Sequence, residues 1–341
     1  MEIVIQVVAA ILVFGLLIFV HELGHFTVGK LSGMRVNQFA IGMGPAIWSK
    51  QRGETKYAIR LFPIGGFVAV EGEDAESSDP RAFCNVRLWK RIAFVCAGAL
   101  MNLILGLVIL SILVALRTSL PTTIISEFHE NASSNRQLQV NDRIIGVNGS
   151  RVFTSNDITF SMISDKDGIV DFTVIRDGRR LEIPAVDFGM ETLDDGTRLI
   201  NLDFYVYTTS KTFWGSVRYS FLWMFSIVRQ VWMSFLNLIT GNFTMSELSG
   251  PVGVSTVIGQ ASTAGIKTLL LLVSFITINI GVFNLLPVPA LDGGRLVFLL
   301  IELVIRRPVN PKYEGLIHAT GFVLLMGIML VVTFNDVVRL F

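Results

Sequence analysis

The sequence predicts an α-helical polytopic membrane protein, with about four transmembrane helices and a small β-rich domain outside the cytoplasm. Its 341 residues are 52% hydrophobic and only 16% charged, and the mean hydropathy is +0.61. Soluble domains carry roughly 25% charged residues. Several apolar runs are long enough to cross a bilayer, and they flank one polar stretch at residues 118–207. The net charge of +1 gives no reason to expect binding to nucleic acid.

The first predicted transmembrane helix covers residues 1–30. Ile3 to Val20 is almost unbroken hydrocarbon, which is long enough to span the bilayer. A cleaved signal peptide begins with basic residues and ends at a motif of small residues. Glu2 stands where the basic residues would be, and no such motif follows. We therefore expect this helix to be retained.

The first helix ends in the motif His21-Glu22-Leu23-Gly24-His25. Residues four apart share one face of a helix, so both imidazoles point to the same place. Two imidazoles suit Zn²⁺, and Glu22 stands where it can take a proton from a metal-bound water. A pair of interfacial histidines bound to headgroups is the alternative, but it does not explain the glutamate between them. The motif predicts His21 and His25 as zinc ligands and Glu22 as the catalytic base.

Residues 31–91 form a predicted cytoplasmic loop with a membrane-associated β-hairpin or re-entrant segment. The stretch from Lys30 to Arg91, both included, contains ten Lys and Arg residues. The positive-inside rule therefore puts this loop in the cytoplasm and the N-terminus outside. Short strands are expected at Ala46 to Lys50 and Lys56 to Phe62, around a turn.

Two stretches rich in glycine and proline flank those strands, Gly42-Met43-Gly44-Pro45 and Pro63-Ile64-Gly65-Gly66. They predict re-entrant loops that shield the metal site, or an edge strand that binds an extended peptide. Ordinary turns at the membrane surface are the alternative. As an edge strand, this segment would bind substrate along Ile64, Gly65, Gly66 and Phe67.

The second predicted span covers residues 92–117. Ala97-Gly98-Ala99 and Gly106 are small enough to allow another helix to approach closely. Asn102 is a polar group within the apolar run, and it needs a hydrogen-bond partner there.

Residues 118–207 are soluble in composition and predict a small β-rich domain. Strands are expected at residues 122–126, 143–147, 169–176 and 180–184, and a helix at 155–163. Asp177-Gly178 predicts a two-residue hairpin turn between the last two strands. Because one span separates this domain from the cytoplasmic loop, we expect it on the extracytoplasmic side.

Residues 208–264 predict an amphipathic helix region on the outer surface. Phe213 to Ile239 is long enough to span the membrane, but Arg218 and Arg229 lie eleven residues apart and so share one stripe of a helix. Hydropathy alone does not decide between a spanning helix and one that lies in the interface.

The basic residues that follow decide the topology. Residues 265–294 contain the third predicted span, and residues 295–341 contain a cytoplasmic loop and the fourth. Four basic residues make that loop cytoplasmic: Arg295, Arg306, Arg307 and Lys312. If Phe213 to Ile239 crossed the membrane, this loop would lie on the outer side. We therefore expect a protein of the cell inner or plasma membrane with both termini extracytoplasmic.

A second polar constellation, Asn284 to Gly294, follows the third span. A catalytic zinc takes three protein ligands, and Asp292 is the best candidate for the third. His21 and Asn284 each lie ~27 Å along their helices from the outer end, at ~1.5 Å per residue. The two constellations therefore reach the same depth. A turn aspartate before two glycines is the alternative.

The chain resembles the site-2 protease family of intramembrane zinc metalloproteases, in particular its bacterial RseP type. The resemblance covers nearly the whole chain and rests on six stretches: residues 21–25, 42–45, 63–67, 98–102, 248–253 and 284–292. It implies that His21, His25 and Asp292 bind zinc and that Glu22 is the general base. It also implies that Asn284 engages the substrate or the transition state, and that the β-rich domain is a PDZ domain.

The expected activity is hydrolysis of peptide bonds within transmembrane segments of single-pass membrane proteins. The resemblance implies regulated intramembrane proteolysis of anti-sigma factors or signal-peptide remnants, after a site-1 protease has acted. The expected partners are transmembrane protein substrates and membrane lipid, with no nucleic acid. A non-catalytic zinc-binding PDZ scaffold is the alternative, but structural zinc sites usually have four ligands. A zinc or proton transporter is a further alternative. It would have polar residues distributed through several spans, whereas here they cluster at one depth.

Overall fold

The computed structural model describes residues 2–338, except 74, 164, 166, 193–197, 201 and 241–248. The chain divides into two compact units. The helical unit comprises Met1–Ile109 and Gln230–Phe341, and the β unit comprises Leu110–Arg229. Two helices, α2 (Leu88–Ala115) and α4 (Phe213–Ile239), begin in one unit and end in the other.

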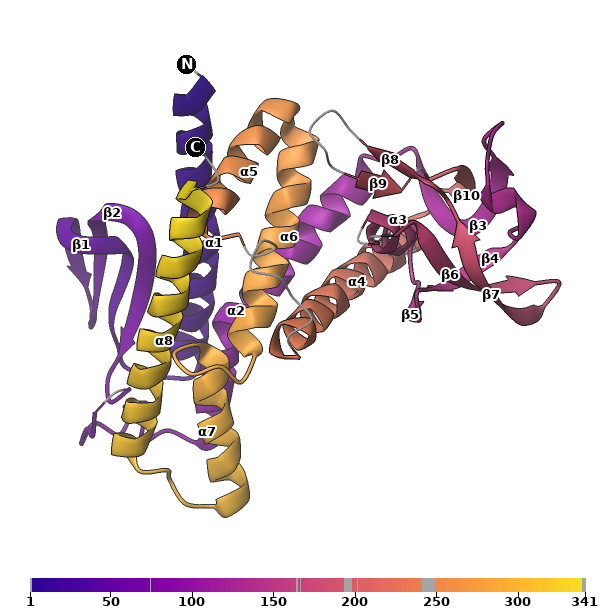
Figure 1. Ribbon diagram of the computed structural model, residues 1–341. Helices are drawn as coiled ribbons and strands as arrows, with labels where there is room; N and C mark the ends of the chain where they lie inside the picture. The colour runs from indigo at the N-terminus through magenta and orange to yellow at the C-terminus, as the bar shows by residue number, and fades with distance from the viewer. Residues whose placement is uncertain are drawn as a thin grey trace. The chain divides into compact units, whose positions relative to one another are not determined.

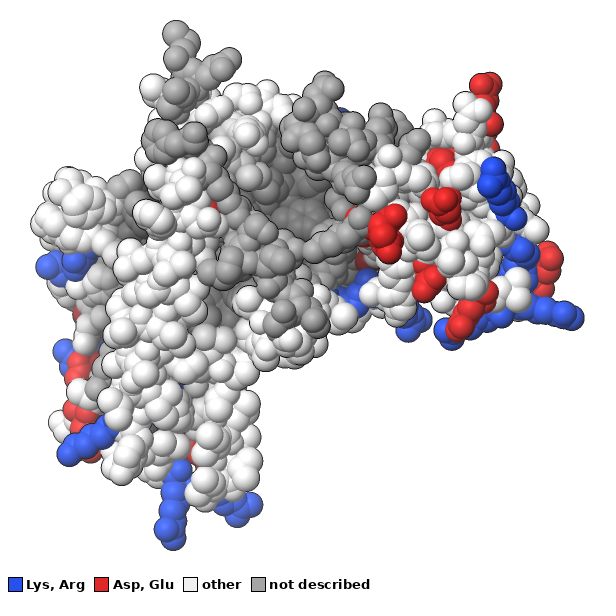
Figure 2. Space-filling model, in the orientation of Figure 1, with Lys and Arg blue, Asp and Glu red and all other residues white. Residues whose placement is uncertain are grey.

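The helical unit is made of long apolar helices and two shorter ones. Besides parts of α2 and α4, it contains α1 (Glu2–Leu31), α5 (Pro251–Ala264), α6 (Ile266–Leu285), α7 (Asp292–Ile305) and α8 (Pro311–Val338). The start of α1 and the end of α8 lie at one end of this unit, and α7 lies at the other (Figure 1). Most of its charged side chains in Figure 2 lie toward the α7 end, while the sides of the helices are uncharged. This distribution is expected of a helical bundle in lipid.

Five helices among the described residues are long and apolar enough to cross a membrane: Val4–Leu31, Leu88–Ala115, Phe213–Ile239, Ile266–Leu285 and Lys312–Val338. They confirm a polytopic membrane protein with a β-sheet region. The helix that the charge pattern places in the interface, α4, is among the five and is the least apolar. Length and composition do not fix its placement, so the four-span topology stays a prediction.

Between α1 and α2 the chain forms a bent hairpin of two long strands, β1 (Val36–Arg52) and β2 (Thr55–Val70). Both strands are longer than the sequence predicted, because the pairing continues through both stretches of glycine and proline. Residues 46–52 pair with 55–60, whereas residues 38–41 pair with both 56–59 and 66–69.

The stretches of glycine and proline are the places where these two strands bend. Gly42 and Gly44 have φ angles of 86° and 85°, which glycine adopts without a steric cost. Since residues 66–69 pair only with 38–41 in the described sheet, they form one of its edges. This arrangement agrees with the edge-strand interpretation of the sequence.

The hairpin packs against α1, and α2 packs closely against both α1 and α6. The ring centroid of Phe39 in β1 lies 5.0 Å from that of Phe26 in α1. A Cβ atom at Gly24 of α1 would collide with the carbonyl of Ala97 in α2, and one at Gly106 of α2 would collide with Ile278 of α6. The structure therefore confirms that the small residues of α2 allow close helix approach.

The β unit is built on a sheet with the strand order β10-β3-β4-β6-β7, and β5 pairs with β4. Its strands are β3 (Ser119–Phe128), β4 (Arg143–Val147), β5 (Ser150–Arg151), β6 (Ile169–Arg176), β7 (Arg179–Asp187) and β10 (Phe204–Ser210). A short helix η1 (Ser134–Arg136), the helix α3 (Ser155–Ile163) and a separate pair, β8 (Met190–Thr192) and β9 (Arg198–Ile200), complete it. Ile144, Val174 and Phe172 belong to its buried core.

The sequence predicted much of this unit correctly. The observed limits of β4, β6 and α3 are the predicted ones. Asp177 and Gly178 have φ angles of 50° and 77°, as a two-residue hairpin turn requires. β10 was not predicted from the sequence, and it pairs with the distant β3.

Candidate metal centre

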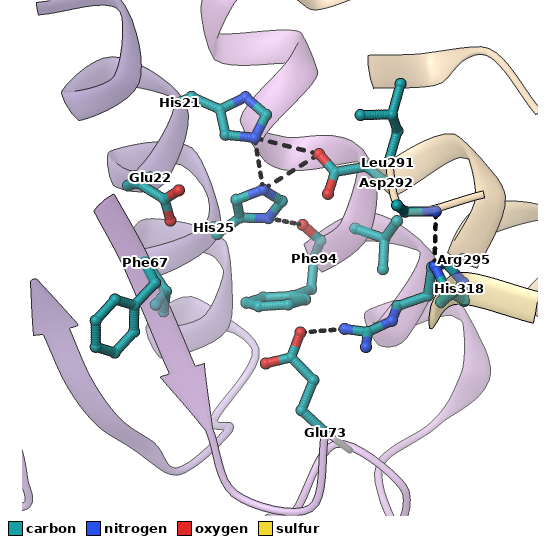
Figure 3. A pocket seen from close by; sticks show the side chains of 13 residues that line it. His21, Glu22, His25, Phe67, Glu73, Phe94, Leu291, Asp292, Arg295 and His318 are labelled. Carbon is teal, nitrogen blue, oxygen red and sulfur yellow. Dashed lines mark hydrogen bonds and ion pairs between the residues drawn. The ribbon is translucent and has the colours of Figure 1, made fainter. Parts of the chain in front are cut away.

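Three potential metal ligands meet in the helical unit. His21 and His25 lie on the last turns of α1, and Asp292 is the first residue of α7. The two imidazole Nε2 atoms are 3.2 Å apart, and each lies 3.3 Å from Oδ2 of Asp292 (Figure 3). The three groups can thus direct their ligand atoms at one ion. The two histidines of α1 and the aspartate of α7 therefore lie together, as the sequence predicted.

A tight loop between α6 and α7 carries Asp292 to the histidines. Ala290 has a φ angle of 72°, in the left-handed region, and its N–H donates to Nδ1 of His318 at 3.0 Å. A Cβ atom at Gly293 would overlap the backbone at Leu286, so this position accepts only glycine. The two glycines after Asp292 therefore allow α7 to pack closely against the loop that precedes it. The carboxylate of Asp292 points to the two imidazoles.

A backbone contact sets the tautomer of His25. Its Nδ1 lies 2.9 Å from the carbonyl of Phe94 in α2 and donates a hydrogen bond to it. With the proton on Nδ1, the lone pair of Nε2 is available to a metal ion. Hydrogen bonds of this kind orient metal-binding histidines and raise their basicity.

The corresponding partner of His21 is Asn102, the polar residue within the second span. Its amide nitrogen Nδ2 lies 3.4 Å from Nδ1 of His21, and Asn102 is fully buried. Its Oδ1 has no hydrogen-bond partner among the described residues. A half-turn of the amide group exchanges the positions of Nδ2 and Oδ1 without moving the rest of the side chain. With Oδ1 turned to His21, it accepts the Nδ1 proton and leaves Nε2 free to bind metal.

Replacing Asn102 with leucine is expected to weaken zinc binding by about 10- to 100-fold, the usual effect of losing such a supporting hydrogen bond. A competition titration with a chromophoric chelator measures the affinity. Asn279→Leu is the matched control, because among the described residues the side chain of Asn279 bonds the carbonyl of Phe275 within its own helix α6 and does not contact the site. Equal losses in both variants would show a general effect of removing a buried amide and would contradict this role.

The donor set fits a bound cation. Oδ2 of Asp292 is buried and accepts no hydrogen bond of normal geometry among the described residues, although two imidazoles lie beside it. A bound metal ion would supply the partner that this buried oxygen lacks.

A cavity of about 260 Å³ surrounds the three ligands. Glu22 lines it, on the side where β2 passes, and the edge residues Phe67 and Val68 of β2 line it too (Figure 3). Gly66 packs against the side chain of Glu22, with 3.1 Å between the Cγ of Glu22 and an ideal Cβ position. The predicted base and the predicted edge strand are thus in contact.

Three other residues predicted to bind substrate are not among the described residues that line this cavity. Gly65 lies at the bend of β2 with a φ angle of 85°. The backbone of Ile64 belongs to β2, while its side chain lies outside the described part of the structure. Asn284 is half-buried at the end of α6 and is not among the described residues that line the cavity.

The cavity also contains polar residues that the sequence analysis did not assign to the site. Arg295, one turn after Asp292 on α7, forms an ion pair with Glu73 at the end of the cavity away from His21 (Figure 3). His318 of α8 lines the cavity and supports the Asp292 loop. The i,i+3 spacing of Asp292 and Arg295 was the one available signal, since Glu73 and His318 are distant in sequence.

Comparison with known proteins gives consistent matches over the length of the chain. A family model described as Peptidase family M50 matches residues 9–328. A protein of Clostridium acetobutylicum provisionally named a zinc metalloprotease is 34% identical over 334 residues, which cover 98% of this chain and 97% of the relative. The "Regulator of sigma-W protease RasP" of Bacillus subtilis is 29% identical over 419 residues, 98% of this chain and 99% of the relative. The "Zinc metalloprotease RasP" of Bacillus licheniformis is 30% identical over 424 residues, with the same coverage.

Proposed function

The chain belongs to peptidase family M50, the site-2 protease family, and we propose that it is a zinc endopeptidase that cuts within the membrane. Its substrates are transmembrane segments of single-pass membrane proteins. The observation that carries this proposal is the convergence of two histidines, one aspartate and Glu22 on a single cavity in a bundle of apolar helices.

The ligands to the metal are His21, His25 and Asp292. Zinc bound there supplies a Lewis acid for the scissile carbonyl and lowers the pKa of water. Glu22 accepts the proton of the attacking water and passes it to the leaving amine, as a base beside the reacting atoms can do. The Nδ1–H of His25 donates to the carbonyl of Phe94. With the amide of Asn102 turned so that Oδ1 faces His21, the Nδ1–H of His21 donates to Oδ1, and the two hydrogen bonds would hold both rings in place during the reaction.

Substrate must be unwound before it can be cut, because a transmembrane helix hides its carbonyl groups in hydrogen bonds. We assign the binding of the unwound segment to the β2 edge at Ile64, Gly65, Gly66 and Phe67. An extended peptide can pair with such an edge through main-chain hydrogen bonds. The contact between Gly66 and Glu22 would bring the bound segment beside the base. Asn284 is assigned to the substrate on family resemblance.

The physiological role proposed here is regulated intramembrane proteolysis. The Bacillus subtilis relative is named as a regulator of sigma-W, which favours anti-sigma factors as substrates over signal-peptide remnants. In such a cascade a site-1 protease removes the outer part of the substrate first. The β unit is proposed to be a PDZ-like domain outside the cytoplasm, because its sheet, its helix α3 and its hairpin turn suit that fold.

A zinc-binding scaffold without activity is the competing function. Structural zinc sites usually have four protein ligands, and the metal-binding group found among the described residues has three. An unused glutamate beside such a site would also lack a purpose. The donor set therefore favours an enzyme.

The purified, zinc-loaded protein in proteoliposomes should cut a single-pass reporter with a product terminus inside its transmembrane segment. A chelator should stop cleavage, and added zinc should restore it. Mass spectrometry of both fragments locates the cut. Cleavage confined to the extramembrane part of the reporter would contradict the proposed function.

The topology can be tested with single cysteines in a background without Cys84 and Cys96. With α4 in the interface, cysteines at Ser210 and at Thr263 should both react with an impermeant maleimide added to whole cells. Both residues are exposed in the structure. A Thr263 cysteine that reacts only after the cells are permeabilised would show that α4 spans the membrane.

A further inference from the structure

One face of α4 is fixed to the β unit by polar and aromatic contacts. Arg229 donates to the buried carboxylate of Asp157 at 3.1 Å, and Ser226 bonds the same group. Arg117 stacks on the ring of Trp223, with its guanidinium carbon 4.9 Å from the ring centroid. These contacts fix the orientation of this helix within the β unit.

A neighbouring stripe of α4 carries large exposed aromatic side chains. Trp214, Phe221 and Phe225 have 77%, 52% and 53% of their surfaces exposed, and they follow one another at helical spacing. A stripe of large exposed aromatic side chains is typical of a helix that lies at a membrane surface. Arg218 is also exposed on this stripe, one turn after Trp214.

Beside this stripe the β unit has a basic cavity of about 850 Å³. Its floor is the sheet, with Thr123 of β3 and Thr173 of β6 among the lining residues, and α4 contributes Leu222. Four arginines line it: Arg143, Arg151, Arg180 and Arg218. In Figure 2 basic side chains gather along the edge of this unit where β5 and β7 lie.

These arginines carry more charge than their neighbours neutralise. Among the described residues, Glu182 is the one carboxylate within ion-pair distance of any of the four, at 3.9 Å from Arg180. Both of those side chains are mostly exposed, with 69% and 80% of their surfaces accessible. The cavity therefore has an excess of positive charge and suits an anion.

We propose that this cavity binds the phosphate headgroup of an anionic phospholipid whose acyl chains lie along the aromatic stripe of α4. A guanidinium group can donate two parallel hydrogen bonds to the oxygens of one phosphate. Basic pockets of membrane proteins bind anionic lipid headgroups. A free phosphate would satisfy the arginines but would make no use of Trp214, Phe221 and Phe225. An amphiphile satisfies both parts of the site.

The occupant would hold the β unit at the lipid surface. The inference concerns lipid binding and does not depend on proteolysis, so it can be tested in a protein carrying Glu22→Gln. Its failure would leave the proposed function untouched.

The test is native mass spectrometry of the full-length, zinc-loaded protein in neutral detergent with equal amounts of phosphatidylglycerol and phosphatidylcholine. We expect preferential retention of phosphatidylglycerol. Each of Arg143→Gln and Arg180→Gln should weaken this retention about fivefold, from the usual contribution of one basic residue near an anionic surface. Arg179→Gln is the matched control, since Arg179 precedes Arg180 in β7 and does not line the cavity.

Three results would overturn the proposal. Equal retention of the two lipids would show that the cavity does not select charge. An equal loss in Arg179→Gln would show a diffuse effect of surface charge. Soluble glycerol phosphate that binds as tightly as phosphatidylglycerol, and displaces it, would show that the aromatic stripe takes no part.

Discussion

Replacing Glu22 with glutamine is expected to abolish proteolysis and to leave zinc affinity nearly unchanged. Glutamine has the size of glutamate but cannot accept a proton from water, and loss of a general base costs about 10²- to 10⁴-fold in rate. Glu22 lines the cavity without belonging to the group of three potential metal ligands. Its removal should therefore affect the chemistry and spare the metal.

The two properties must be measured on the same preparation. Cleavage of a transmembrane reporter gives the rate, and metal analysis after gel filtration gives zinc per chain. Glu76→Gln is a suitable control, because Glu76 is exposed in the loop that follows β2. A Glu22→Gln protein that cuts at the wild-type rate would show that another group is the base.

The convergence of His21, His25 and Asp292 could be predicted from the sequence because it depends on simple helix geometry. His21 and His25 need only a helix to share a face. Asp292 could be matched to them from helix length and membrane topology alone, without knowledge of the packing. The limits of β4 and β6 could also be predicted, since a short run of strand-forming residues marks each of them locally. The turn at Asp177-Gly178 also marks the end of β6.

The parts that could not be predicted depend on contacts between distant segments. The pairing of residues 38–41 with 66–69 extends β1 and β2 through stretches that read as loop breakers. The helix α7 was expected as a loop, because its basic residues were interpreted for topology rather than for structure. The Arg295–Glu73 ion pair joins residues more than two hundred positions apart, and nothing in a single sequence links them.

Asn102 shows where prediction from sequence alone stops. A buried amide in an apolar helix must find a partner, so the requirement could be stated from the sequence. The identity of that partner depends on how α1 and α2 cross, which close contact at Gly24 and Ala97 determines. Only the structure connects the amide to His21 and so to the metal centre.

Replacing Asp292 with asparagine is expected to remove most of the bound zinc, the converse of the result at Glu22. The amide keeps the size of the side chain but loses the charge, and two neutral imidazoles remain. Loss of a supporting hydrogen bond already costs metal affinity about 10- to 100-fold, so loss of a ligand should exceed about 100-fold. Zinc per chain after dialysis and the affinity from chelator competition measure the effect.

The fold should survive this change, since Gly293 and the Ala290–His318 hydrogen bond still shape the loop. The circular dichroism spectrum and the elution volume of the variant should therefore match the wild type. Activity should fall with zinc content, and excess zinc should restore part of it, whereas no amount of zinc should rescue Glu22→Gln. This difference in rescue separates a ligand from a base. An Asp292→Asn protein that keeps a full complement of tightly bound zinc would show that the third ligand lies elsewhere.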